Sequence, residues 1–271
     1  MDKKGQRLDM PLDSTRPFVF ILEGEMAHFS TEALHYHSCH QILRIRSGIT
    51  LLVDAHWKQP LFSNMTAFIP SGFPHRSVIV GEPVQYKSIY LQESLFPQSI
   101  ENIVIFDMSD LGVALFERIG HFIDTGEADP EDVGHQCLRL LLKLMETEIR
   151  NRSSLTRIPV PLNPDNRKIT DYIAKNFGDK IKLSDFTAVL YYSERHLSRI
   201  FKDDLKITVF EYLKLYRIFQ ASLLLSDGRS SKTVTEIAMA CGYNSLSSFF
   251  KDFKDIFAMT PKAFCEKLPL P

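Results

Sequence analysis

The chain has 271 residues, which is room for about two domains, and 44% of them are hydrophobic and 24% charged. This composition is typical of a soluble globular protein. The formal net charge of −1 indicates no particular partner, but residues 165–271 carry a net charge of +4 and the rest of the chain −5. A mildly basic tail is compatible with nucleic acid binding by that tail.

The sequence argues against a disulfide-stabilised protein, a zinc-finger protein, a secreted protein and a membrane protein. The four cysteines are scattered without a C-x-x-C pair, which argues against a disulfide framework or a zinc finger and favours a reducing compartment. The opening segment MDKKGQRLDM lacks the apolar stretch of a signal peptide. No apolar run approaches the ~20 residues that a membrane helix needs. We therefore expect a cytoplasmic protein without a membrane-spanning segment.

Residues 18–108 carry the signals of β-strands. Short runs rich in β-branched and aromatic residues are separated by Gly, Pro, Asn and Ser. The runs are FVFIL, ILRI, ITLLV, TAFIP, SVIV, YKSIYL and IVIF. Short strands at such close spacing predict a barrel or a sandwich.

Two helices are expected after the strands, because apolar residues recur at helical spacing behind Ser109 and again behind the segment EADPED. The expected apolar faces are Leu111, Ala114, Leu115, Ile119, Phe122 and Ile123 in the first helix and Leu138, Leu141, Leu142, Met145 and Ile149 in the second. These faces either close the barrel or form the seam of a dimer. Residues 152–166 follow, with three prolines and no periodicity, and they predict an interdomain linker.

The last hundred residues contain one pattern twice. Residues 183–201 and 234–253 each predict a short helix, a break and a second helix that ends in a Phe-Lys pair. The short helices are expected to be capped by Ser184 and Thr235. One such unit could be any amphipathic helix pair, but its duplication favours a double helix-turn-helix reader of DNA major grooves.

In each unit the apolar positions of the second helix are expected to face inward, which leaves a polar face for DNA. Arg and His side chains on such a face can reach base edges or phosphates. Two recognition helices ~34 Å apart can enter successive major grooves of one duplex. The candidate DNA contacts are Ser193, Arg195, His196, Ser198, Arg199 and Lys202 in the first unit and Asn244, Ser245, Ser247, Ser248, Phe250, Lys251 and Lys254 in the second.

The tail resembles the DNA-binding domain of the AraC/XylS family of bacterial transcription regulators. The resemblance covers about residues 165–266 and is carried by SERHLSRIFKDDL and VTEIAMACGYNSLSSFFKDFKDIFAMTP. It implies that the base-facing residues are Arg195, Ser198 and Arg199 in the first unit and Ser247, Ser248, Phe250 and Lys251 in the second.

The tail departs from the family pattern in two ways. Lys206 and Ala258 stand where the family usually has glycine, and a non-glycine residue can hold that turn at a modest cost. The second recognition helix is weakly polar, with Lys251 as its only charge near the groove. The first unit is therefore expected to supply most of the sequence discrimination.

The front domain contains two histidine-bearing segments. In HYHSCHQILRIRSG, the two-residue period of a strand places His35, His37 and Gln41 on one face, with Arg44 on the other and His40 expected at the surface. The segment PSGFPH follows at residues 70–75. Both segments resemble the motifs of the cupin barrel, which is a common front half in the same regulator family. The matching residues are His35, His37, Gln41 and Gly48 for the first motif, with Gln in place of the usual Glu, and Pro70, Gly72 and His75 for the second.

The predicted ligand of the barrel remains open between two classes. Three imidazoles that converge can hold one divalent transition metal such as Ni, Zn, Co or Fe, or Cu. Alternatively, His35, His37, Gln41 and His75 line a pocket and form hydrogen bonds with an organic effector. Gln41 is a poorer ligand than Glu because it is neutral, which counts against tight metal binding.

Together these observations predict an α+β protein of two domains. A cupin-like barrel with flanking helices occupies residues 1–151, a linker residues 152–166, and an all-α double helix-turn-helix domain residues 167–271. We expect a DNA-binding transcription regulator controlled by a small molecule or metal in the barrel. The alternatives are a metal-sensing regulator of a transport or efflux gene and, less favoured, a metal-dependent cupin enzyme, for which the double helix-turn-helix has no evident use.

The family resemblance also implies partners. The region of residues 109–151 commonly dimerises in the family, so a homodimer is expected. RNA polymerase is a further partner if the protein is an activator.

Overall fold

The computed structural model describes residues 6–7, 19–26, 33–80, 83–96, 100–123, 133–150, 157–226 and 232–267. The chain divides into two compact units, one of residues 1–54 and 60–154 and the other of residues 55–59 and 155–271. Strands dominate the first unit and helices the second. This confirms the predicted α+β class with two domains.

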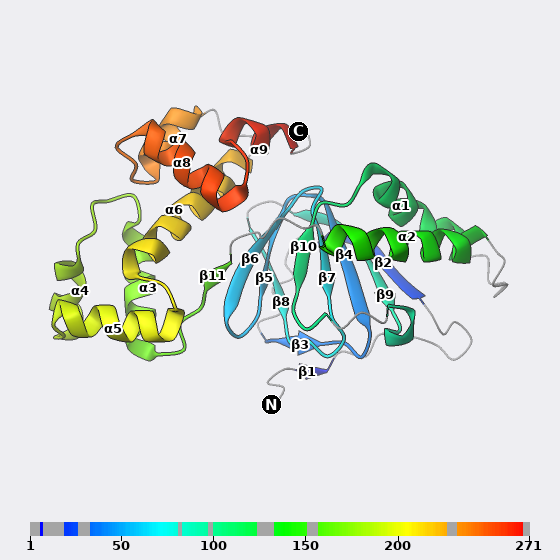
Figure 1. Cartoon of the computed structure of the whole chain (residues 1–271), viewed down its shortest axis with the longest axis horizontal. Helices are drawn as coiled ribbons and strands as arrows, with labels where there is room; N and C mark the ends of the chain where they lie inside the picture. Colours follow the sequence, from blue (N-terminus) through cyan, green and yellow to red (C-terminus); the bar gives the residue numbers. More distant parts are fainter. Residues whose placement is uncertain are drawn as a thin grey trace. The chain divides into compact units, whose positions relative to one another are not determined.

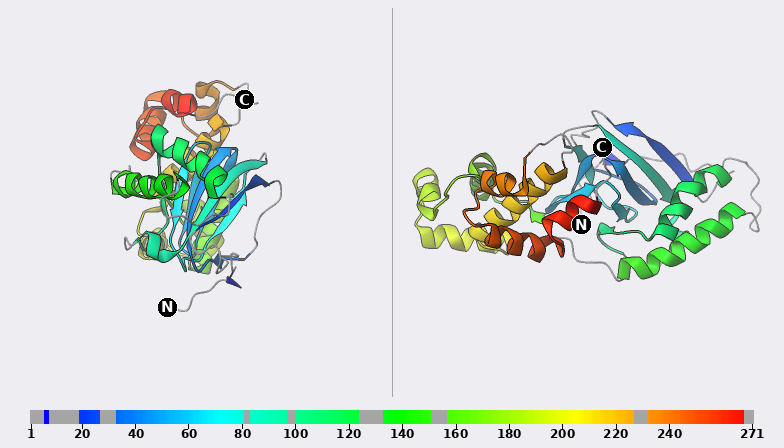
Figure 2. Two further views of the ribbon diagram at one scale, coloured as in Figure 1. Left: turned by 90° about the vertical axis from the view of Figure 1, so that its right-hand side faces the viewer. Right: turned by 90° about the horizontal axis from the view of Figure 1, so that it is seen from above.

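The N-terminal unit is built on a five-stranded sheet with the strand order β10-β7-β4-β9-β2, in which the neighbouring strands are antiparallel. Its strands are β2 (Val19–Met26), β4 (His40–Ser47), β7 (Thr66–Ile69), β9 (Val84–Leu91) and β10 (Val104–Phe106). A second sheet has the order β11-β6-β5-β8. Figures 1 and 2 show the strands of the N-terminal unit from three sides.

The second sheet consists of β5 (Ile49–Val53), β6 (Trp57–Phe62), β8 (Arg76–Ile79) and β11 (Ile158–Pro159). Strands β1 (Gln6–Arg7) and β3 (His35–Tyr36) form a short parallel pair. All seven predicted runs contain a strand, but β6 was not predicted. Its sequence WKQPLF contains Pro60, which cannot donate a ladder hydrogen bond and so argues against a strand. Residues 55–59 group with the C-terminal unit, since β11 pairs with Trp57 and Lys58.

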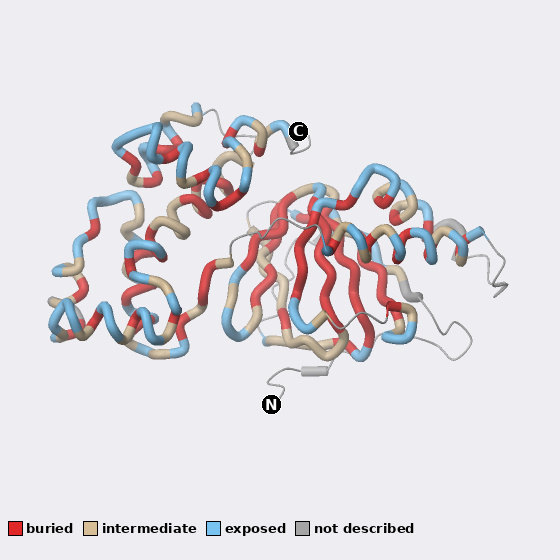
Figure 3. Tube along the Cα trace, in the orientation of Figure 1, coloured by how far each residue is buried: buried red, intermediate tan, exposed pale blue. Residues whose placement is uncertain are grey.

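Helices α1 (Asp110–Ile123) and α2 (Val133–Arg150) pack on the five-stranded sheet. Every residue of the predicted apolar face of α2 is buried. The face predicted for α1 is partly wrong. Ile119 is buried as predicted, but Leu111 is 52% exposed, Ala114 is exposed, and Phe116, which was not predicted, enters the core. The side chains of Phe122 and Ile123 lie outside the described residues. Figure 3 shows the buried positions along α2.

The leucine side chains of α2 pack into the hydrophobic core of the N-terminal unit. Residues of both helices form one cluster with strand residues such as Ile42, Phe68 and Ile89. Burial of each such side chain stabilises the folded protein by about 1.5–3 kcal/mol relative to leaving it exposed. The leucine face of α2 therefore packs within its own protomer. This agrees with the alternative in which the helices cover the strands, and not with the one in which the leucines form the seam of a dimer. A homodimer through residues 109–151 stays a prediction, and it would need other residues of these helices.

A polar network holds α1 against the same sheet. The Lys87 side chain is buried, its Nζ donates to the backbone oxygen of Glu117 at 2.7 Å, and burial lowers its pKa. Arg46 forms an ion pair with the carboxylate of Glu117 and another with Glu23 at 2.9 Å. These contacts fix the orientation of α1 on the face of the sheet opposite to the one that carries Gln41 of β4.

The C-terminal unit is helical. Its helices are α3 (Pro164–Asn176), α4 (Leu183–Leu190), α5 (Glu194–Leu205), α6 (Val209–Ser226), α7 (Val234–Ala240), α8 (Leu246–Phe257) and α9 (Pro261–Lys267). Within this unit, α6 runs between the α4–α5 pair and the α7–α8 pair (Figure 1). The predicted helix between the two helix-turn-helix units is thus present.

Several predicted boundaries in this unit shift by a few residues. Residues 157–166 of the predicted linker are ordered, since they contain β11 and the start of α3, while residues 152–156 lie outside the described part. Proline at the first helical position is compatible with a helix start, and Asn163 caps α3 by accepting from the backbone N–H of Asp165 at 2.8 Å. Helices α4 and α7 begin before the predicted caps Ser184 and Thr235, with Lys182 and Thr233 at the N-cap positions.

Within the described residues, none of the helices combines the length and the apolar character that crossing a membrane requires.

Candidate DNA-binding surface and histidine site

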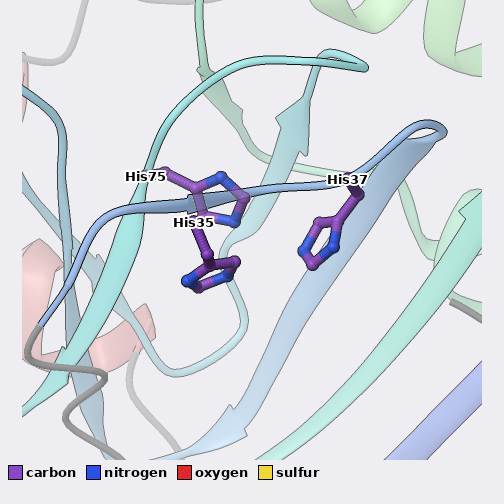
Figure 4. Close-up of side chains that lie close together, drawn as sticks. All are labelled: His35, His37 and His75. Atoms are coloured by element: carbon purple, nitrogen blue, oxygen red, sulfur yellow. The ribbon is translucent and has the colours of Figure 1, made fainter. Parts of the chain in front are cut away.

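Three histidines of the N-terminal unit converge, as the two predicted motifs required (Figure 4). His35 and His75 are opposite one another, and each donates its backbone N–H to the backbone oxygen of the other at 2.8 Å. Their ring centroids are 4.5 Å apart, and those of His37 lie 5.1 Å from His35 and 5.3 Å from His75. One potential ligand atom from each of the three lies within 4.8 Å of the others.

The loop before β8 fixes the orientation of His75. The backbone N–H of Gly72 donates to the backbone oxygen of His37 at 2.7 Å, and Gly72 adopts a φ of 68°, which glycine tolerates best. The Nδ1 atom of His75 lies 2.9 Å from the carbonyl oxygen of Phe73. Because a carbonyl can only accept, Nδ1 carries the proton, and Nε2 keeps a lone pair that can bind a metal or accept a hydrogen bond.

Burial sets the protonation of this cluster. His37 is 4% exposed and His75 2% exposed. Burial, together with the neighbouring His37, lowers the pKa of His35 to about 4. Burial also lowers the pKa of His75 to about 3, against the opposing effect of the hydrogen bond to Phe73. These two imidazoles are therefore neutral near pH 7, which is the state that binds a metal ion.

Gln41 contributes to the cluster through Tyr90. Its Nε2 donates to Ser88 Oγ at 3.0 Å and to the Tyr90 hydroxyl at 3.1 Å, and the Tyr90 ring lies 5.2 Å from that of His37. The Oε1 atom of Gln41 is buried without a hydrogen-bond partner among the described residues. An orphaned acceptor of this kind suits a bound cation or a donor group of a ligand.

The prediction that His40 lies at the surface is wrong. His40 is 8% exposed, and its Nδ1 accepts from the backbone N–H of Ser71 at 3.0 Å. Its ring packs against Phe68 and Phe96, both members of the core beneath α1 and α2. The face of β4 that carries His40 does point away from the His35 cluster, but packed residues cover it.

An open polar depression leads to the cluster. It has a volume of about 560 Å³. Its lining consists of Tyr36, His37, Ser38, Ser71, Gly72, Gln92, Glu93 and Ser94. His37 belongs to both the depression and the cluster, so a small ligand has a route from solvent to this imidazole.

The two recognition helices of the C-terminal unit are built alike. Each has 12 residues. Ser193 caps α5 by accepting from the backbone N–H of His196 at 3.3 Å, and Ser245 caps α8 by accepting from that of Ser248 at 3.4 Å. The inward residues are Leu197, Phe201 and Leu205 in α5 and Phe249, Phe253, Ile256 and Phe257 in α8.

The predicted DNA contacts lie on the opposite faces of these helices. All of them are exposed except His196, which is half-buried with its ring 4.8 Å from that of Tyr192. The Nδ1 atom of His196 lies 3.2 Å from Nη2 of Arg199, so these two side chains form one polar group. Phe250, an aromatic on the polar face of α8, is 40% exposed. Contact of these residues with DNA stays a prediction, but their side chains are available for it.

Two carboxylates of the recognition helices are used inside the unit. Asp204 of α5 accepts from the backbone N–H groups of Leu162 and Asn163, at 3.3 Å and 3.1 Å. Asp252 of α8 accepts from the Tyr243 hydroxyl at 3.1 Å. These carboxylates attach each recognition helix to the rest of the C-terminal unit, because their oxygens accept hydrogen bonds from Leu162, Asn163 and Tyr243.

Comparisons with known proteins agree with this geometry. A model of a helix-turn-helix domain matches residues 186–267. An uncharacterised helix-turn-helix transcriptional regulator of Staphylococcus aureus is 34% identical over 104 residues, which are 38% of this chain and 14% of that protein. The xylose operon regulatory protein of Haemophilus influenzae is 29% identical over 151 residues, or 51% of this chain and 38% of that protein. The chain thus spans 14% to 38% of the length of these two relatives.

The C-terminal unit carries a helix-turn-helix domain of the AraC type. Among solved structures, a probable AraC family transcriptional regulator from Rhodopseudomonas palustris is 29% identical and covers 40% of this chain and 100% of its own, with a TM-score of 0.38. ToxT from Vibrio cholerae is 14% identical and covers 93% of this chain and 99% of its own, also with a TM-score of 0.38.

The two departures from the AraC/XylS pattern do not disturb the turns. Lys206 ends α5 with a φ of 61°, and Ala258 ends α8 with a φ of 56°. Each donates its backbone N–H to the oxygen four residues earlier, at 3.0 Å and 2.9 Å. Both residues therefore occupy the left-handed cap that glycine fills most cheaply.

Two residues of the helix-turn-helix domain were not predicted from the sequence. Tyr191, in the turn before α5, is 94% exposed and has a φ of 56°. Arg217 lies in the middle of α6 and contacts the end of α3 on one side and the α7–α8 turn on the other. A signal for Arg217 was available, since a charge inside a helix that is apolar on most sides needs a partner. No sequence pattern indicated the left-handed backbone of Tyr191.

Proposed function

We propose that this protein is an AraC/XylS-type regulator and binds double-stranded DNA in a sequence-specific manner, with α5 and α8 in successive major grooves. The observation that carries the proposal is the repeated geometry of two recognition helices with equal lengths, matching serine caps and exposed polar faces. Helix N-termini and capping serines favour nearby phosphates, and arginine can read guanine by paired hydrogen bonds. The first unit, with Arg195 and Arg199, carries more of this potential than the second.

Selection from a randomised duplex library tests the DNA-binding proposal. The purified protein should enrich a sequence with two conserved blocks whose centres lie about one helical turn, or ~34 Å, apart. The control is the Arg195→Ala/Arg199→Ala double variant, which should lose enrichment of one block. Failure of the wild-type protein to enrich any sequence would contradict the proposal.

We further propose that a ligand at His35, His37 and His75 controls DNA binding. A divalent transition metal (Zn, Ni, Co or Fe) fits the donor set, since one potential ligand atom from each of the three histidines lies within 4.8 Å of the others. The metal would act by binding more tightly to one of two arrangements of the regulator. If the metal is itself the signal, the regulated gene is expected to encode a transport or efflux protein.

Metal analysis tests the ligand proposal. We expect near-stoichiometric metal in tag-free wild-type protein and none in the His35→Ala/His75→Ala variant. His56→Ala is the matched control, because His56 is exposed and lies outside the cluster. No metal after reconstitution with Ni, Zn, Co and Fe would contradict a metal ligand and leave an organic effector in the polar depression. Turnover by the metal-loaded protein, without DNA binding, would favour the cupin enzyme instead.

We also infer a homodimer through residues 109–151, in contact with RNA polymerase if the protein activates transcription. Binding to the chromosome would place this dimer in the cytoplasm. The exposed apolar residues Leu111, Val133 and Leu140 are available for such an interface, at 52%, 54% and 46% exposed. Sedimentation equilibrium should give twice the mass of the chain for the wild type and the monomer mass for Leu111→Asp/Leu140→Asp. A monomeric wild type at micromolar concentration would contradict the dimer.

A further inference from the structure

Arg217 of α6 binds the end of α3, next to the first helix-turn-helix unit. Its Nε donates to the backbone oxygen of Phe177 at 2.8 Å, and its Nη2 donates to that of Asp179 at 2.7 Å. Phe177 is the C-cap of α3, and Asp179 lies in the turn that leads to α4. A cation that donates to carbonyls at a helix C-terminus is favourably placed.

The same guanidinium contacts the second unit on its other side. It lies 5.9 Å from the ring centroid of Tyr243, a residue of the α7–α8 turn. A Cβ atom added at Gly242 would lie 2.6 Å from Nη2 of Arg217 and 2.8 Å from the backbone oxygen of Phe177. Gly242 therefore allows the turn of the second unit to approach both Arg217 and the end of α3.

A second close contact brings the α3–α4 turn against the end of α7. A Cβ atom added at Gly178, in the α3–α4 turn, would lie 2.8 Å from the backbone oxygen of Ala240 at the end of α7. From Tyr243 the connection continues to α8, since its hydroxyl donates to Asp252. A continuous set of contacts thus runs from the end of α3 through Arg217 and Tyr243 to the second recognition helix.

We propose that Arg217 is a positioning residue that fixes the second recognition helix relative to the first, so that the regulator discriminates the spacing between its two DNA half-sites. Each base pair inserted between half-sites moves them apart by about 3.4 Å and rotates one by about 35°. Two recognition helices that are held in one geometry cannot follow this displacement, whereas loosely joined units can. This inference rests on the proposed binding of DNA by both helices.

The chemistry of the side chain explains why arginine is needed. Its planar fork presents two donors at a fixed angle to two carbonyls while its Cζ atom lies over the Tyr243 ring. The lysine ammonium is a point charge on a flexible stem, so Arg217→Lys keeps the charge but loses the fork. Both accepting atoms are neutral carbonyls, so the positioning effect should persist when salt is raised.

The test measures affinity against spacing. Duplexes carry the selected site unchanged, or with one or two base pairs inserted or deleted between the half-sites, and one duplex carries the first half-site alone. Wild type should lose affinity on the order of 10- to 100-fold when the spacing changes, because one half-site is then misplaced. Arg217→Lys should show a flatter profile, with a smaller loss at altered spacing and unchanged affinity for the single half-site.

Two further variants test whether the effect comes from the contacts between the α3–α4 turn and the α7–α8 turn and not from the Arg-to-Lys change itself. Gly178→Ala should flatten the profile in the same way, because the added methyl separates the α3–α4 turn from Ala240 without touching Arg217. Arg167→Lys is the matched control, since Arg167 also donates from Nε to a backbone oxygen, that of Pro161 at 3.2 Å, but joins no second unit. Its profile should match that of wild type, and circular dichroism melts establish that each variant is folded.

The inference is overturned if folded Arg217→Lys and Gly178→Ala keep the wild-type spacing profile. It is also overturned if they lose affinity equally for every duplex, the single half-site included, or if wild type tolerates every spacing. A different result would contradict the proposed binding of DNA by both recognition helices. In that case, scrambling the second half-site would leave the wild-type affinity unchanged at all spacings.

Discussion

The candidate ligand-binding residues of the N-terminal unit and the candidate DNA contacts of the C-terminal unit differ in their exposure to solvent. His37 and His75 are buried and His35 is half-buried, whereas nearly all candidate contacts on α5 and α8 are exposed on helices whose opposite faces form the core. A buried polar group must find partners within the fold, so its replacement changes stability together with ligand binding. An exposed side chain can be replaced with little change in stability. The two domains should therefore respond differently to substitution and to pH.

The largest expected effect is on the exposed surface. Arg199→Ala should weaken binding to the selected site by about 1–3 kcal/mol, since arginine that reads a base loses both hydrogen bonds at once. Binding to non-specific DNA should fall far less, and the free energy of unfolding should not change. Fluorescence anisotropy on specific and scrambled duplexes measures both affinities. Equal losses on the two duplexes would show that Arg199 contacts phosphate only, and Lys251→Ala is expected to have the smaller effect.

The buried site should make stability depend on pH. Burial lowers the pKa of His35 to about 4 and of His75 to about 3 in the folded protein, while histidine in the unfolded chain titrates near ~6.5. The unfolded chain thus binds more protons in this range. The stability that these groups contribute is complete above pH ~6.5 and is lost as pH falls toward 4, by up to about 1.4 kcal/mol per pH unit for each proton.

Urea unfolding of the metal-free protein at pH 7.5 and pH 5 measures this dependence. His75→Asn should reduce the difference between the two pH values, and His56→Asn, at an exposed position, should leave it as in wild type. An unchanged difference in His75→Asn would contradict the neutral, buried state of this imidazole.

The caps of the recognition helices should contribute alike in the two units. Ser193→Ala and Ser245→Ala each remove the acceptor for one backbone N–H, which costs about 1 kcal/mol. Thermal unfolding of the two variants should show similar decreases in Tm, and Ser→Thr at each position should recover most of the loss. A loss at one cap alone would show that the two units are not equivalent in stability.

The smallest expected effect is a gain in stability. Lys206→Gly and Ala258→Gly remove a side chain from a residue with positive φ. The relief of strain exceeds the added entropy of the unfolded chain, for a net gain of roughly 0.5–1 kcal/mol. Asp203→Gly, at an exposed position inside α5, should instead lower the free energy of unfolding by about 1 kcal/mol. Lower stability of both C-cap variants would contradict this account of the turns.

Local periodicity explains most of what the sequence predicted correctly. The seven predicted strands, the apolar face of α2 and both recognition helices follow from patterns of two and 3.6 residues. The strand β6 was missed because Pro60 is compatible only with special positions in a sheet. The early start of α3 was missed because Pro164 was interpreted as a linker residue, although proline is suited to the first turn of a helix.

The remaining features depend on contacts between distant segments. His40 was expected at the surface, but α1 and α2 create a core on that face of β4. The histidine cluster was predicted from motifs, yet the mutual hydrogen bonds of His35 and His75 depend on how β3 meets the segment before β8. Arg217 acquires its partners only when α3, α6 and the α7–α8 turn come together. Tertiary contacts of this kind have no local pattern in the sequence.

Control of DNA binding by the N-terminal unit is tested by the coupling between the histidine cluster and the DNA-binding surface. The Kd for the selected duplex is measured with and without saturating Zn, Ni, Co or Fe, in wild type and in His35→Ala/His75→Ala. We expect one of these metals to change the wild-type Kd by about 5- to 150-fold and to leave the Kd of the double variant unaffected. An identical wild-type Kd in the presence and absence of every metal would contradict control of DNA binding by a metal at the three histidines.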